Sequence, residues 1–124
     1  MSKKVLVIED NEQNLYLITF ILEKHGYQVF PAHDGQSGID LVNQVSPDLI
    51  LLDIQLPGMN GYQVAEKLRE MYGGQKIPII AVTSYAMVGD KEKALAAGCT
   101  GYVTKPINPE TIIPYIESFL IQQN

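Results

Sequence analysis

The apolar run 49–52, which leads directly into the carboxylate of Asp53, constrains the fold more than any other stretch. Pro47 precedes the run and Pro57-Gly58 follows it, so the segment is too short for a helix and is typical of a strand buried on both faces. Ligands of open parallel sheets bind just beyond the carboxyl ends of the strands. We therefore expect Asp53 to face solvent at the bottom of a surface crevice. The alternative is that Asp53 only caps a turn or the next helix.

Other apolar runs share this form and alternate with segments of helical periodicity. The run 4–8 closes on Glu9 and Asp10, and further strands are expected over 27–31, 78–83 and 100–104. Helices are expected to begin near Asn11, Gly35, Asn60, Asp90 and Asn108. Five strands alternating with five helices predict an α/β fold with a doubly wound, five-stranded parallel sheet. Right-handed crossovers favour the strand order 2-1-3-4-5, as in flavodoxin-like proteins.

Three details of the helices can be predicted from spacing. Val64, Leu68 and Met71 are expected to form the buried face of the helix that Asn60 caps. The Ala-rich helix over 90–97 has only a thin apolar face, so it should be weakly held. Pro114 lies inside the last helix, where it removes a backbone donor and should loosen or bend the first turns.

Composition narrows the class of protein. The chain has 124 residues, which suits one domain over 1–124, and 46% of them are apolar. Nine scattered cations against 14 anions give a net charge of −5, which argues against a nucleic-acid surface. We expect no membrane span and no signal peptide. A single cysteine, Cys99, fits a reducing cytoplasm, and Met1 together with the polar end indicates a complete chain.

The predicted strand order brings three carboxylates together. Strands one and three are neighbours in that order, so Glu9, Asp10 and Asp53 should meet at one edge of the sheet. Clustered carboxylates repel one another and lose hydration, so the cluster needs a cation. Carboxylates, a backbone carbonyl and waters are the ligands of Mg²⁺, whereas zinc and copper sites use His, Cys or Met. The sequence therefore predicts a magnesium site.

Two further strand ends carry Thr83 and Lys105. A hydroxyl and an ammonium group facing a metal-bound carboxylate suit a phosphoryl group, because the metal and the lysine neutralise its oxygens. Neither a G-x-x-x-x-G-K-S/T nor a G-x-G-x-x-G motif occurs, so no glycine-rich phosphate loop is indicated. Asp53 is the candidate nucleophile that would form an aspartyl phosphate. Taken singly, each residue also has an ordinary structural explanation, and the argument depends on their matching positions.

The set of residues as a whole resembles the receiver domain of two-component response regulators. The resemblance covers essentially the whole chain and rests on Glu9-Asp10, Asp53, Thr83, Tyr102 and Lys105-Pro106. Within that family the chain is most similar to DivK-like single-domain regulators and to receivers of hybrid kinases, through Ala81-Val82-Thr83-Ser84-Tyr85-Ala86-Met87, Gly89-Asp90 and Lys105-Pro106-Ile107.

The resemblance implies a phosphorylation site and a metal site. Asp53 would accept a phosphoryl group from a histidine kinase or a histidine phosphotransfer protein. Glu9, Asp10, Asp53 and the main-chain carbonyl of Gln55 would hold Mg²⁺. Gln55 and Tyr85 occupy positions that the family uses to tune the lifetime of the phosphate.

The resemblance also implies a switch. Lys105 would contact a phosphoryl oxygen from a solvent-facing position, Thr83 would move toward the phosphoryl group, and Tyr102 would turn inward. The surface that changes would comprise residues from about Met87 to Ala96, Tyr102 and the final helix near Tyr115, and would bind a downstream protein rather than nucleic acid or a membrane.

Three other interpretations remain open from sequence. A Mg²⁺-dependent phosphohydrolase with an aspartyl-phosphate intermediate usually has a second acid two residues after the nucleophile, where this chain has Gln55. A flavin or nucleotide binder of flavodoxin-like fold would meet repulsion between its phosphates and the acidic cluster. The chain could also be a receiver excised from a larger regulator or hybrid kinase. We favour a signalling module that is not an enzyme.

Overall fold

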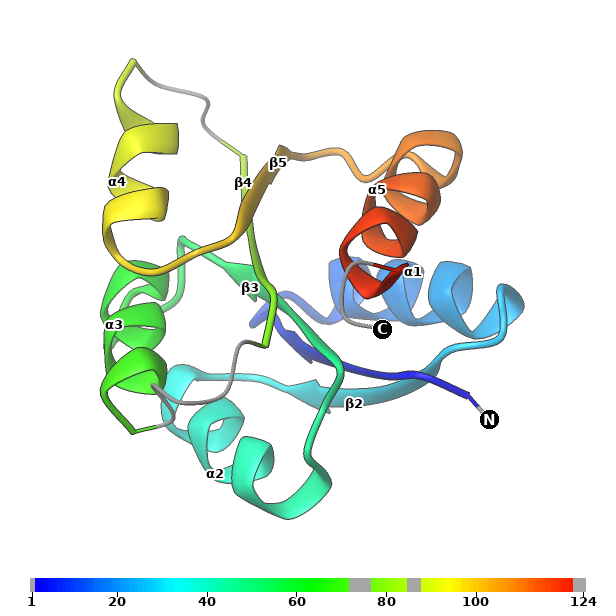
Figure 1. Ribbon diagram of the computed structural model, residues 1–124, viewed down its shortest axis with the longest axis horizontal. Helices are drawn as coiled ribbons and strands as arrows, with labels where there is room; N and C mark the ends of the chain where they lie inside the picture. Colours follow the sequence, from blue (N-terminus) through cyan, green and yellow to red (C-terminus); the bar gives the residue numbers. More distant parts are fainter. Residues whose placement is uncertain (1, 72–76, 85–87, 122–124) are drawn as a thin grey trace.

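The computed structural model describes residues 2–71, 77–84 and 88–121 and shows a central sheet with helices on both faces (Figure 1). The strands are β1 (Lys4–Ile8), β2 (Gln28–Ala32), β3 (Leu49–Asp53), β4 (Ile79–Thr83) and β5 (Gly101–Thr104). The helices are α1 (Glu12–Lys24), α2 (Gly35–Val45), α3 (Gly61–Met71), α4 (Asp90–Ala96) and α5 (Pro109–Ile121). All strand pairs are parallel, and the order is β2-β1-β3-β4-β5, which confirms the predicted fold.

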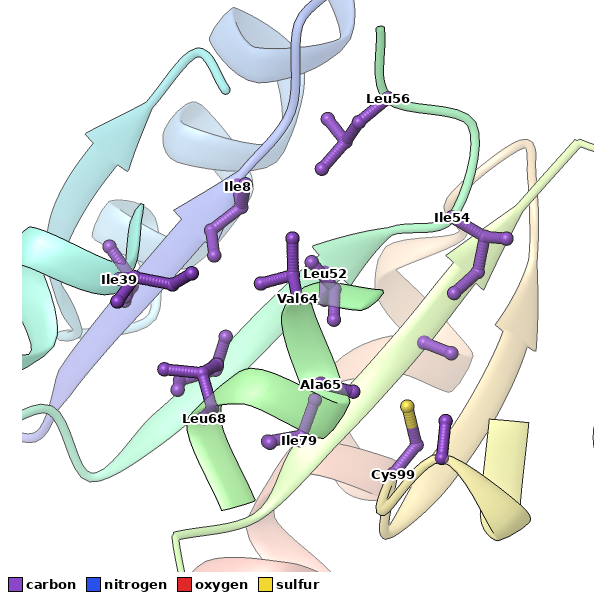
Figure 2. Packing of buried hydrophobic residues seen from close by; sticks show 14 of the residues in the cluster. Ile8, Ile39, Leu52, Ile54, Leu56, Val64, Ala65, Leu68, Ile79 and Cys99 are labelled. Atoms are coloured by element: carbon purple, nitrogen blue, oxygen red, sulfur yellow. The ribbon is translucent and has the colours of Figure 1, made fainter. Parts of the chain in front are cut away.

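The central strands are buried on both faces because each face is covered by helices. Successive residues of β1 point to opposite faces of the sheet. Leu6 belongs to one apolar cluster and Val7 to the other. One cluster joins the sheet to α2, α3 and α4, and the other joins it to α1 and α5, in agreement with the two layers of helices in Figure 1. Figure 2 shows the first cluster, where Val64 and Leu68 of α3 lie over Leu52 and Ile79 of the sheet. In this doubly covered arrangement the buried polar side chains Glu9, Asp53 and Thr83 lie at the ends of the strands.

Helices α1 and α3 begin directly after the asparagines that were predicted to cap them. The Asn11 side chain accepts a hydrogen bond from the backbone N–H of Asn14, 2.9 Å away. Asn60 and Gln63 form a reciprocal pair, in which each side chain accepts from the backbone N–H of the other at 3.0 and 2.9 Å. Such caps satisfy donors that have no partner inside the helix. They fix the points at which α1 and α3 leave the loops that follow β1 and β3.

Some local expectations need correction. The second strand begins and ends one residue later than expected, and it accommodates Pro31 because it lies at the edge of the sheet. Met71 is 51% exposed rather than buried, since the last residue of α3 lines a shallow surface hollow beside Ile39 and Asn43 of α2.

The last two helices differ in how firmly they are held. Ala94 is the buried residue within α4, so the thin apolar face predicted for that helix is confirmed. Helix α5 runs through Pro114 without a break and buries Ile112, Ile113, Ile116 and Leu120. Phe119, which has the helical spacing of a buried residue, is only half-buried. The carbonyl that loses its donor to Pro114 is that of Glu110, which lies in an exposed first turn where water can replace the donor. Within the described ranges, no helix is long and apolar enough to cross a bilayer.

Candidate functional site

Three carboxylates meet where β1 and β3 end. The register pairs Ile8 with Leu52, so Glu9 and Asp53 follow at neighbouring positions on the two strands. Ligand oxygens of Glu9, Asp10 and Asp53 all lie within 4.8 Å of one another, which confirms the predicted convergence. Asp10 is exposed, but Glu9 and Asp53 are only 2% and 3% exposed. The expectation that Asp53 faces solvent was therefore wrong, because neighbouring side chains cover the end of β3.

Lys105 brings a positive charge into this cluster from the residue after β5. Its Nζ lies 2.8 Å from Oε1 of Glu9 and 3.5 Å from Oδ2 of Asp53. The backbone N–H of Lys105 donates to the carbonyl of Thr83 at 2.8 Å, and the Lys105–Pro106 peptide bond is cis. Its side chain is only 14% exposed, so the predicted solvent-facing position was wrong. Lys105 instead acts as the counterion of two buried carboxylates.

The balance of charges leaves Asp53 easier to protonate than an ordinary aspartate. The pKa of Asp53 is raised from 3.8 to about 6, mainly by burial and in addition by hydrogen bonding to Glu9 and repulsion from its charge. The backbone N–H of Gln55, which donates to Oδ1 at 3.0 Å, and the charge of Lys105 act in the opposite direction. One lysine therefore does not fully compensate the buried pair.

The donor set fits a hard divalent cation. All three side chains offer carboxylate oxygens, and such oxygens are the ligands that Mg²⁺ and Ca²⁺ prefer. Oε2 of Glu9 accepts a hydrogen bond from the backbone N–H of Asn11 at 3.2 Å. Oε1 is buried and, within the described part of the chain, lies beside Lys105 without a donor in hydrogen-bonding geometry. This unsatisfied carboxylate oxygen is the kind of group that a cation would stabilise.

The side chain of Gln55 links the Thr83 hydroxyl to the end of β3. Thr83 ends β4 and is 1% exposed. The Nε2 group of Gln55 donates to Oγ1 of Thr83 at 2.6 Å, and the backbone N–H of Ser84 donates to Oε1 of Gln55 at 3.2 Å. The sequence singled out the main-chain carbonyl of Gln55, but it did not reveal this bridging role of the side chain. The only signal was the position of Gln55 two residues after Asp53.

Tyr102 lies further from the carboxylates. It pairs with Ala81 in the register of β4 and β5, two positions before the pair of Thr83 and Thr104. The half-buried ring packs against the apolar cluster on the α4 side of the sheet. Burial, and secondarily the charges of Asp90 and Glu92, raise the pKa of Tyr102. The ring is thus placed between the sheet and α4. Tyr85 and Met87, which the sequence also singled out, lie outside the described residues.

Gly61 is a supporting residue that sequence analysis missed. A Cβ atom at this position would lie 2.5 Å from the carbonyl oxygen of Asp53 and 2.6 Å from Cα of Ile54. The start of α3 therefore packs directly against the backbone that carries Asp53, and only glycine permits this approach. A glycine placed directly after the Asn60 cap was the available signal.

Comparisons with known proteins agree with this geometry. The model of the response regulator receiver domain matches residues 5–117. The polar-differentiation response regulator DivK of Brucella ovis is 41% identical over 120 residues, which cover 97% of this chain and 98% of that protein. A CheY-like receiver domain protein from Methanospirillum hungatei superposes with a TM-score of 0.91 at 31% identity, covering 99% of this chain and 97% of that one.

A second solved structure bears on the metal site. It is the receiver domain of a sensor histidine kinase from Pseudomonas aeruginosa, described as having a magnesium ion coordinated in the active site cleft. It matches with a TM-score of 0.88 at 31% identity and covers 97% of this chain and 98% of that one. The family match, the DivK relative and the strand order lead to one conclusion: the chain belongs to the response regulator receiver domain family of two-component signalling.

Proposed function

We propose that this chain is a phosphoacceptor of a two-component phosphorelay, in which Asp53 takes a phosphoryl group from a histidine kinase or a histidine phosphotransfer protein. The observation that carries the proposal is the position of Lys105, whose Nζ lies 2.8 Å from Glu9 and 3.5 Å from Asp53. A carboxylate nucleophile, an acidic neighbour and a cation are held together at rigid strand ends. Such groups provide the positioning and charge stabilisation on which phosphoryl transfer depends.

The transfer step uses the ionised carboxylate of Asp53 as its nucleophile. One of its oxygens attacks the phosphorus of the phosphohistidine, and a new O–P bond forms as the P–N bond breaks. The departing nitrogen keeps the electron pair of that bond and takes up a proton from solvent. With a pKa of about 6, Asp53 is mostly ionised at neutral pH and can act as the nucleophile. Lys105 would neutralise charge on the phosphoryl oxygens.

We assign Mg²⁺ as the cation of the site. Glu9, Asp10, Asp53 and the main-chain carbonyl of Gln55 would hold it, and the magnesium named for the Pseudomonas receiver supports this choice. When bound, Mg²⁺ would offset the repulsion of the carboxylates and polarise phosphoryl oxygens. The buried Oε1 of Glu9 would then gain a second positive partner beside Lys105.

The output would be contact with another protein in the cytoplasm. A phosphoryl group on Asp53 offers Thr83 a strong acceptor, and inward movement of Thr83 would let Tyr102 turn toward the interior. The surface that responds would be α4, β5 and the exposed side of α5 near Tyr115. The weakly held α4, with Ala94 as its buried residue, is suited to move.

The first experiment tests phosphorylation directly. The protein is incubated with Mg²⁺ and acetyl phosphate or phosphoramidate, and intact-mass spectrometry with peptide mapping locates the modification. A mass gain of one phosphate that maps to Asp53 and is absent from Asp53→Asn is expected. Many turnovers of an added phosphate monoester would instead favour the phosphohydrolase. A modification on another residue would contradict the assignment of Asp53.

The second experiment tests the output surface. Backbone amide shifts are compared with and without beryllofluoride, a mimic of the phosphoryl group, in the presence of Mg²⁺. Shifts in α4, at Tyr102 and in α5 are expected. Shifts confined to the loops around Asp53 would leave the chain with a role in phosphate storage only.

A further inference from the structure

The side chain of Gln55 joins the ends of two strands although the residue itself is exposed. Its Nε2 donates to Oγ1 of Thr83 at 2.6 Å, and its Oε1 accepts from the N–H of Ser84 at 3.2 Å. We call these two hydrogen bonds the Gln55 bridge. The backbone N–H of the same residue donates to Oδ1 of Asp53 at 3.0 Å, which places the bridge directly beside the nucleophile.

The strands do not need the Gln55 bridge to stay in place. The β3–β4 ladder already pairs Asp53 with Val82, and the N–H of Ile54 donates to the carbonyl of Val82 at 3.0 Å. The N–H of Lys105 donates to the carbonyl of Thr83 at 2.8 Å, which holds the end of β4 from its other neighbour. The bridge therefore acts on the Thr83 hydroxyl and the Ser84 N–H rather than on the path of the backbone.

A phosphoryl group on Asp53 would compete with Gln55 for these two groups. The Ser84 N–H has one hydrogen and can donate fully either to Oε1 of Gln55 or to a phosphoryl oxygen. Movement of the Thr83 hydroxyl toward Asp53 would lengthen a 2.6 Å contact with Nε2. A ligand shifts an equilibrium only through contacts that differ between the two states. The Gln55 bridge is such a contact, because it is present in the unphosphorylated form and would be lost in the phosphorylated one.

We propose that the Gln55 side chain is a positioning residue that holds Thr83 and Ser84 in the unphosphorylated arrangement and releases them when Asp53 is phosphorylated. The proposal rests on the proposed function and deepens it. Since each net hydrogen bond corresponds to roughly a fivefold change in an equilibrium constant, the two bonds of the bridge set how much the site must gain before it switches.

The test measures the affinity of the full chain for beryllofluoride at saturating Mg²⁺. Gln55→Leu keeps most of the side-chain volume and removes both hydrogen bonds, and Gln55→Ala is a second variant. Gln36→Ala is the matched control, because the side chain of that glutamine donates to Asp40 on the exposed surface of α2, away from the site. Mg²⁺ affinity and melting temperature are measured on all four proteins to separate positioning from stability.

Both Gln55 variants are expected to bind beryllofluoride about 5- to 25-fold more tightly than the wild type, at Mg²⁺ concentrations that saturate each protein. The control should match the wild type. In the ligand-free protein, the amide resonances of Thr83 and Ser84 should shift toward their beryllofluoride-bound positions in both variants.

Two results would overturn the proposal in distinguishable ways. Unchanged or weaker beryllofluoride binding by the Gln55 variants, while the wild type binds, would refute the role of the Gln55 bridge and leave phosphorylation of Asp53 intact. Weaker binding would mean that the Gln55 amide contacts the phosphoryl group instead. Failure of the wild type to bind beryllofluoride at all would overturn the proposed function and the bridge together.

Discussion

Replacing Asp53 with asparagine should stabilise the metal-free protein at neutral pH. The pKa of Asp53 is raised from 3.8 to about 6, so the folded state disfavours the ionised carboxylate that the unfolded chain carries freely. At about 1.4 kcal/mol per pH unit, this difference corresponds to a destabilisation of about 3 kcal/mol at pH 7. The pKa of about 6 already includes the attraction of Lys105, whose Nζ lies 3.5 Å from Asp53, so asparagine removes a net penalty. We expect a net gain of about 1–3 kcal/mol in the free energy of unfolding.

The raised pKa of Asp53 also determines how the stabilisation by Asp53→Asn changes with pH. Between about pH 4 and 6 the folded wild type holds a proton on Asp53 that the unfolded chain has released, so the contribution of Asp53 to stability falls as the pH rises through this window. Above about pH 6 the penalty is fully present. The advantage of Asp53→Asn should therefore be near zero at about pH 4 and largest at about pH 7.

Thermal melts in the presence of a chelator would measure the effect. For a chain of this length, about 1 kcal/mol shifts the melting temperature by roughly 3–5 °C, so Asp53→Asn should melt about 3–15 °C above the wild type at pH 7. Adding Mg²⁺ should narrow the gap by stabilising the wild type. A variant that is no more stable than the wild type at pH 7, or whose advantage does not change with pH, would refute the reasoning.

Three further predictions concern the same site. Asp10→Asn should also raise the metal-free melting temperature, though less than Asp53→Asn because Asp10 is exposed, and thermal melts measure this. The same variant should weaken Mg²⁺ binding, which calorimetric titration measures. Lys105→Ala should lower the free energy of unfolding by about 2 kcal/mol without metal, because it leaves buried Glu9 without its counterion. Chemical denaturation should show that Mg²⁺ restores most of this stability. An equal loss with and without Mg²⁺ would contradict the prediction. Gly61→Ala should destabilise the protein, despite the better helix propensity of alanine, because its Cβ would displace the backbone of Asp53. The same displacement should lower the rate of phosphorylation. Denaturation and phosphorylation time courses test both effects, and a more stable, fully active variant would be inconsistent with the close packing.

Much of the fold could be read from local patterns. Short apolar runs that end in carboxylates, separated by segments of helical periodicity, leave few topologies once crossovers are right-handed. The order β2-β1-β3-β4-β5 follows, and with it the meeting of Glu9, Asp10 and Asp53. The asparagine caps of α1 and α3 could be predicted because capping depends on a few consecutive residues. Periodicity and capping are local properties, and sequence carries them directly.

Exposure and side-chain direction were decided only by the tertiary structure. The sequence indicated that Asp53 and Lys105 lie at strand ends, but not that they are 3% and 14% exposed and paired in a covered site. Met71 has the spacing of a buried residue and lies half-exposed at the rim of α3. The reach of the Gln55 amide to Thr83 depends on the relative placement of two strands and on a rotamer chosen by its surroundings. These features arise from contacts between segments far apart in the chain, which no local spacing specifies.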